Sequence, residues 1–183
     1  MNAIEIMMNE HRNIEEMLNI MRAACLKILT HEDIDYNDFD LMIKFVRNYA
    51  DGHHHNKEEV ILFNIMTDNL GVLAEKLIKY GMLVEHDLGR LYISNLEEAL
   101  GKVKNGDEES KLDLIGNAIA YCDLLKRHID KEDRVVYTFA ERELSEELLS
   151  EISNKCMSYE EKHDMIKEEY ISILNELKNK YLK

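Results

Sequence analysis

Two short histidine and glutamate pairs are the part of this sequence best suited to chemistry. One is His54-x3-Glu58, in the run HHHNKEEVILF, and the other is His128-x3-Glu132, in the run RHIDKEDRVVYTF. Residues four apart lie on the same face of an α-helix, so each pair can present an imidazole and a carboxylate to one point. Each pair therefore predicts a metal-ligand arrangement, and the chain contains two of them.

Long amphipathic helices are the elements expected to position these pairs. The 183 residues include no proline and seven glycines, and apolar residues recur at steps of three and four in five stretches. Turn-forming residues separate the stretches at 31–40, 67–71 and 105–107, and Ser145 has the character of a helix N-cap. The sequence predicts an all-α, up-and-down four-helix bundle with an additional C-terminal helix. We expect a single domain over 1–183, with its core at 4–140 and a helical extension at 145–182.

Polar residues interrupt the apolar stripes near the middle of the first four helices. They are His11, His54, Glu58, His86, His128 and Glu132. Burying an unpaired carboxylate costs on the order of several kcal/mol, so two buried glutamates need compensating positive charge. Arg90 is the basic residue that the pattern places near the buried face that carries these residues. Imidazole and carboxylate together favour iron, manganese or zinc over calcium, which predicts two metal ions bridged by the two carboxylates in the bundle core.

The order of these residues resembles that of hemerythrin-like (HHE cation-binding) proteins. The resemblance rests on the order His, His-x3-Glu, His, His-x3-Glu, on HHHNKEE followed by LF, and on RHIDKED followed by VVY, and it covers about residues 4–139. It implies that the four histidines are terminal iron ligands and that Glu58 and Glu132 are bridging carboxylates. The cofactor that it implies is a pair of iron ions, Fe2+ or Fe3+, with an oxo or hydroxo bridge, for which zinc or manganese can substitute.

The third helix departs from oxygen-carrying hemerythrin, which has two histidines four residues apart there. The positions that flank His86 at this spacing are Met82 and Arg90, so one imidazole is missing, which argues against reversible O2 carriage. Four histidines and two glutamates are instead similar to the repair-of-iron-centres proteins, as is Glu85 directly before His86. The resemblance implies a nonheme diiron protein that binds or reacts with O2, NO or peroxide in oxidative and nitrosative stress. The alternatives are an oxygen or redox sensor and an iron storage or delivery protein for iron-centre repair, and enzymatic turnover is undecided.

Three residues are candidates for additional ligands. His163 lies on the apolar stripe of the last helix, where it is either a fifth imidazole ligand or a core or interface histidine. Glu15 follows His11 by four residues and is either a ligand, a hydrogen-bond acceptor for a ligand imidazole or a solvated residue. Asp133 is the alternative to Glu132 as the second bridging carboxylate, because oxygen-carrying hemerythrin places its carboxylate five residues after the histidine.

Other polar residues near the ligands are expected to have supporting or structural roles. His53 and His55 point about 100° to either side of His54 on an α-helix, which predicts that they lie on the surface or behind the ligands. Three tyrosines near the ligand-bearing turns can either pack in the core or hydrogen-bond to an iron-bound ligand: Tyr49, Tyr121 and Tyr137.

Charge and composition exclude several classes of partner. The net charge of −14 disfavours nonspecific binding to nucleic acid or to an anionic membrane. No apolar run approaches the roughly 20 residues needed to span a bilayer, and the N-terminus lacks a signal-peptide core, so a cytoplasmic location is expected. Cys25, Cys122 and Cys156 lack metal-site or disulfide spacing and are expected to be core thiols. The C-terminal helix is the expected surface for a homodimer or a protein partner.

Overall fold

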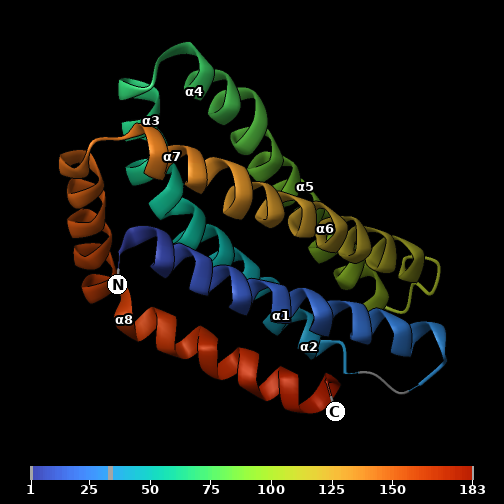
Figure 1. Cartoon of the computed structure of the whole chain (residues 1–183). Coiled ribbons are helices and arrows are strands. Elements are labelled where there is room, and N and C mark those ends of the chain that lie inside the picture. The colour runs from blue at the N-terminus through green and yellow to red at the C-terminus, as the bar shows by residue number, and fades with distance from the viewer. Residues whose placement is uncertain (1, 33–34, 183) are drawn as a thin grey trace.

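Five long helical stretches make up the protein. The computed structural model describes residues 2–32 and 35–182, and every regular element in them is helical (Figure 1). The all-α bundle prediction is therefore confirmed. The stretches are, in order, α1 (Ala3–Leu29); α2 (Asn37–Phe45), η1 (Val46–His55), η2 (Glu58–Phe63) and α3 (Asn64–Asn69); α4 (Gly71–Leu77), η3 (Ile78–Met82) and α5 (Leu83–Lys104); α6 (Lys111–Lys131), η4 (Glu132–Val136) and α7 (Tyr137–Glu143); and α8 (Glu146–Tyr181).

The helix ends follow local sequence signals. Ser145 caps α8 by accepting a hydrogen bond from the Leu148 amide at 3.3 Å, which confirms the predicted N-cap. Gly71 and Gly106 have φ angles of +68° and +90° in the two predicted turns, a backbone conformation that favours glycine. These turns fold the chain back on itself, so that successive stretches pack side by side.

π-helical turns interrupt the second, third and fourth stretches. η1 ends on the three successive histidines, η2 begins at Glu58, and η4 begins at Glu132. A π-helix bonds i to i+5, so it has more residues per turn than an α-helix and a smaller rotation between successive side chains. His53, His54 and His55 are all buried, because α8 covers His53 and α5 covers His55 on either side of the central histidine.

A polar layer separates two apolar clusters along the bundle axis. One cluster includes Ile14, Tyr49 and Leu125, and the other includes Met7, Phe63 and Tyr137. The three cysteines are buried free thiols within these clusters, as predicted, and burial raises the pKa of Cys122 to about 12. Packing on either side thus holds the helices together while the layer between them is free to carry polar side chains.

The last helix, α8, lies against α1 and rests on both apolar clusters. Its first half contributes Ile152 and Cys156 to one cluster, and its end contributes Leu177 to the other. No residue from 157 to 173 is buried, and the ribbon of α8 changes direction between its two halves (Figure 1). The middle of α8 is therefore held less tightly than its ends.

Among the described residues, no helix combines the length and the apolar character that crossing a bilayer requires.

Candidate metal centre

Two groups of buried histidines and glutamates meet at the polar layer. The first ligand group is His11, His54, Glu58 and Glu132, and the second ligand group is His55, Glu58, His86 and His128. Within each group, one ligand atom from every residue lies within 4.8 Å of the others. The structure therefore brings together all six residues singled out in the sequence, and it adds His55.

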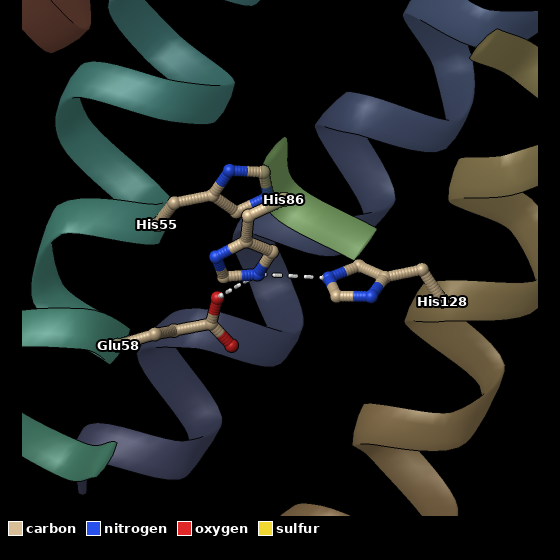
Figure 2. Close-up of side chains that lie close together, drawn as sticks. All are labelled: His55, Glu58, His86 and His128. Carbon is tan, nitrogen blue, oxygen red and sulfur yellow. Dashed lines mark hydrogen bonds and ion pairs between the residues drawn. The ribbon is translucent and has the colours of Figure 1, made fainter. Parts of the chain in front are cut away.

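Each of the first four helical stretches contributes to these groups. His11 comes from α1, His86 from α5 and His128 from α6, whereas the remaining members lie on the π-helical turns η1, η2 and η4. Figure 2 shows the second ligand group, with the side chains of three helical stretches converging on one point. None of the six predicted residues exceeds 1% exposure, so the centre is closed to bulk water.

Each of the two glutamates contacts at least one imidazole of each group. The Glu58 Oε2 atom lies 3.6 Å from Nε2 of His54 and 3.6 Å from Nε2 of His86. Glu132 places Oε2 3.3 Å from Nε2 of His11 and Oε1 3.2 Å from Nε2 of His128. Both carboxylates therefore stand between the two groups, which is the placement that bridging ligands of a dinuclear centre need.

Behind the imidazoles lies a ring of carboxylates. Five Nδ1 atoms each lie near an acidic oxygen, in the pairs His11 with Asp133 (2.6 Å), His54 with Glu10 (2.9 Å), His55 with Asp51 (3.3 Å), His86 with Glu59 (2.7 Å) and His128 with Glu85 (2.9 Å). A carboxylate only accepts hydrogen bonds, so the Nδ1 atoms carry the protons. This arrangement orients metal-binding imidazoles and raises their basicity.

Cations in turn hold the outer carboxylates. Arg12 pairs with Asp133, Lys57 with Glu10, and Lys131 with Glu85. Arg90 lies 2.7 Å from Asp51 and 2.7 Å from Glu59. Arg90 therefore pairs with two outer carboxylates and does not compensate the two inner glutamates, which agrees with the expectation that metal ions do so.

Several buried atoms of the inner layer have no hydrogen-bond partner among the described residues. They are Nε2 of His54, Oε2 of Glu58 and both carboxylate oxygens of Glu132. The nitrogens of His11 and His128 lie close to Glu132, but not in hydrogen-bonding geometry. Buried polar atoms are rarely left unpaired, because each costs roughly 1–3 kcal/mol. Metal ions would satisfy all four atoms, so the residues fit a metal centre.

When no metal is bound, the pKa values of the inner residues also show the effect of two carboxylates placed close together. Burial and the charge of Glu132 raise the pKa of Glu58 well above its usual value. Burial acts in the same direction on Glu132, but contacts with His128 and His11 outweigh it and hold that pKa well below its usual value. Burial opposes a charge on His11 too, yet the hydrogen bond with Asp133 raises its pKa to about 9. Burial and the charge of His11 lower the pKa of His54 to about 4.

The three candidate additional ligands lie outside the inner layer. Asp133 is on the outer side of His11, and Glu15 pairs with Arg12 at 2.8 Å. His163 places Nδ1 2.8 Å from the backbone oxygen of Tyr159 in α8. None of the three belongs to either ligand group.

Of the two positions expected for His53 and His55, on the surface or behind the ligands, the surface position is wrong. His53 is 2% exposed because Tyr159 of α8 covers it, and His55 is 5% exposed because its ring stacks on His86. Of the tyrosines, Tyr137 donates a hydrogen bond to Oε1 of Glu58 at 2.6 Å, so it belongs to the centre rather than to apolar packing alone. Tyr49 accepts a hydrogen bond from Asn13, and the buried Tyr121 hydroxyl has no partner among the described residues.

Sequence reasoning missed a second buried polar cluster next to the centre. Lys57 is 0% exposed and contacts Glu10 of α1 and Glu160 of α8, and His53 lies 3.1 Å from Glu10 and 3.0 Å from Glu160. Lysine is rarely buried without partners, and these partners come from distant parts of the chain. The nearest local signal was the His53-x3-Lys57 spacing, which places an imidazole and an ammonium group one helical turn apart.

Comparison with known proteins agrees with the geometry. The model of the hemerythrin HHE cation binding domain matches residues 2–140, which include both ligand groups and end before α8. No curated protein and no solved structure matches the chain. This chain therefore belongs to the hemerythrin HHE cation-binding family, and its buried histidine and glutamate clusters fit a metal-binding protein.

Proposed function

We propose that the centre holds two iron ions and binds or reacts with O2, NO or peroxide in defence against oxidative and nitrosative stress. His11 and His54 would hold the first ion, His86 and His128 would hold the second, and Glu58 and Glu132 would bridge them. The observation that carries this proposal is the position of both carboxylates between the two ligand groups. A bound iron pair supplies one-electron redox chemistry and an exchangeable position for a small ligand.

The surrounding residues would keep that centre rigid and dry. The outer carboxylates fix each imidazole with its Nδ1 proton outward, so that Nε2 faces the metal. Tyr137 holds Glu58 through Oε1 and leaves Oε2 toward the imidazoles. Its ring also stacks on His11 with 5.5 Å between the ring centres, which restricts both side chains.

Metal analysis with optical spectra tests the proposal. Protein purified without oxygen is expected to contain two irons per chain, and its spectrum is expected to change on addition of O2 or NO. One zinc per chain, retained equally by a His54→Ala variant, would contradict the proposal. Iron that stays spectroscopically silent toward O2, NO and peroxide would contradict the reactive role and leave a structural metal centre.

An outer carboxylate should affect metal binding without contacting the metal. Glu85→Gln keeps an acceptor for His128 but removes the charge that raises its basicity, so we expect metal affinity to fall roughly 10–100-fold. Titration with Fe2+ under nitrogen measures the change. Glu98→Gln, on the exposed face of the same helix α5, should leave the affinity unchanged. Equal affinities for the two variants would show that the outer ring has no such role.

A sensing role is the second candidate, and the contact between the centre and α8 favours it. His54 contacts Glu10, Glu10 contacts Lys57, and Lys57 contacts Glu160 of α8. Lys167 adds a 2.7 Å contact to the same glutamate. The middle of α8 thus meets the bundle through charged groups at the level of the centre. A change at His54 can pass along this chain of contacts to a segment that has no buried residue.

Amide hydrogen exchange of residues 157–173 tests this second function. We expect the segment to exchange at different rates in metal-free and metal-loaded protein, because loading changes the charge that His54 presents to Glu10. Glu160→Gln should remove most of the difference in exchange rate between the two states. Glu161 is exposed, so Glu161→Gln should preserve the difference. Identical exchange in both states of the wild-type protein would contradict the sensing role.

A further inference from the structure

The third helical stretch lacks an imidazole at both positions one turn away from His86. Met82 and Arg90 occupy them, and Arg90 is committed to Asp51 and Glu59. The space beside His86 is not empty, however. The ring of His55, from the neighbouring stretch, stacks on His86 with 3.8 Å between the ring centres and 9° between the ring planes (Figure 2).

His55 is directed into the second ligand group. One of its ring nitrogens lies within 4.8 Å of ligand atoms of Glu58, His86 and His128. Its ring centre is also 5.8 Å from that of His128, at an interplanar angle of 81°. The π-helical turn η1 makes this possible, because His54 serves the first group while the next residue along the chain serves the second.

The surroundings of His55 orient its ring and leave it room to tilt. Its Nδ1 atom lies 3.3 Å from Asp51, one turn earlier, and Arg90 fixes that carboxylate from α5. The adjoining cavity, lined by His55, Gly89 and Tyr121 among others, has a volume of about 20 Å³. Imidazole lone pairs lie in the ring plane, so the His55 ring must tilt away from its parallel stack on His86 before both can bind one ion. A cavity that accommodates about one water molecule leaves room for such a tilt. His55 thus has an outer carboxylate, which a cation holds, as the histidines predicted to be ligands also have.

We propose that His55 is a ligand of the second metal ion and replaces the imidazole that the third stretch lacks. This inference rests on the proposed dinuclear function. The second ion would then have three imidazoles, from His55, His86 and His128, and the first would have two. The exchangeable position would lie on the first ion, beside Tyr137, and the missing histidine would no longer argue against reversible O2 binding.

A purely structural role for His55 makes a different prediction from coordination. Stacking on His86 requires an aromatic ring, whereas coordination requires a nitrogen lone pair. His55→Phe keeps the ring and removes the nitrogens. His163→Phe is the control, because His163 also stacks on an aromatic ring, that of Tyr159, but belongs to no group of possible metal ligands.

Titration with Co2+ under nitrogen, monitored by the visible spectrum, distinguishes coordination by His55 from a purely structural role. Wild-type protein and His163→Phe should each bind two Co2+ per chain. His55→Phe should bind one with unchanged affinity and the other at least about tenfold more weakly, with altered visible bands. If His55→Phe fails to fold, His55→Gly with added imidazole replaces it, and recovery of the wild-type spectrum is expected.

The possible failures are distinguishable. Two Co2+ ions bound by His55→Phe with wild-type affinity and spectrum would overturn the role of His55 and leave the dinuclear centre intact. The same conclusion would follow if imidazole left the spectrum of His55→Gly unchanged. Fewer than two Co2+ ions per wild-type chain would instead contradict the proposed dinuclear function itself.

Discussion

Glu58→Gln is expected to abolish the binding of two metal ions by one chain while leaving the metal-free protein folded. Glu58 belongs to both ligand groups, so its loss removes a ligand from each ion together with the bridge between them. We expect the affinity for the second ion to fall by more than the roughly 100-fold that loss of an outer hydrogen bond can cost. Metal analysis after removal of free metal measures the stoichiometry.

The same substitution should have little effect on the stability of the metal-free protein. Burial and Glu132 raise the pKa of Glu58 when no metal is present, which shows that the metal-free fold disfavours a charge at this position, and an uncharged amide removes that unfavourable contact. Glutamine has a similar shape and can still accept a hydrogen bond from Tyr137. The free energy of unfolding should therefore change by less than about 1 kcal/mol, a typical net value for one hydrogen bond.

Asp38→Asn is the matched control for this experiment. Asp38 is a buried carboxylate distant from both ligand groups, where Tyr181 and Lys180 contact it. Its replacement should lower the free energy of unfolding by roughly 1–3 kcal/mol, because a hydrogen bond to a charged group is lost, but both metals should remain. If both variants lost metal in proportion to their loss of stability, Glu58 would have a structural role only.

The helices and six site residues could be predicted because their signals are local. Apolar residues at steps of three and four define the buried face of each helix, and His11, His54, Glu58, His86, His128 and Glu132 fall on those faces. An ionisable residue at such a position needs a partner, and six of them on four helices point to one shared site. That reasoning requires no knowledge of how the helices are packed.

The burial of His55 and Lys57 could not be predicted in this way. Counting at 100° per residue assumes an α-helix throughout, and the π-helical turns shift every side chain that follows them. Lys57 is fully buried because Glu10 of α1 and Glu160 of α8 contact it, and these partners come from distant parts of the chain. Four of the five outer carboxylate pairs were also hidden, because pairs such as His128 with Glu85 join different helices and depend on tertiary packing.

Removal of the metal ions is expected to lower the thermal stability of the protein strongly. An ion that binds only the folded chain, present at a thousand times its Kd, adds about 4 kcal/mol to the free energy of unfolding. For a chain of this size, this corresponds to roughly 8–16 °C in Tm for each ion. Calorimetry before and after chelation measures the shift, and restoring the metal should reverse it. Glu58→Gln should show less than half of the wild-type shift.

The loss of stability should be concentrated in the polar layer. The two apolar clusters pack the helices on either side of it and do not depend on metal. Within the layer, unpaired atoms of His54, Glu58 and Glu132 face one another, and the two glutamates begin π-helical turns. Local opening is favoured where backbone hydrogen bonds have few apolar contacts to protect them.

Amide exchange in the metal-free protein should therefore accelerate at 53–58 and 128–136, while α1 near Leu18 and α6 near Leu125 stay protected. The apolar cluster around Leu18 and Leu125 supplies the packing that maintains this protection without metal. Uniform acceleration along all the helices would show that the ions stabilise the bundle as a whole. The proposal that the apolar clusters stabilise the fold and the metal ions stabilise only the polar layer between them would then be incorrect.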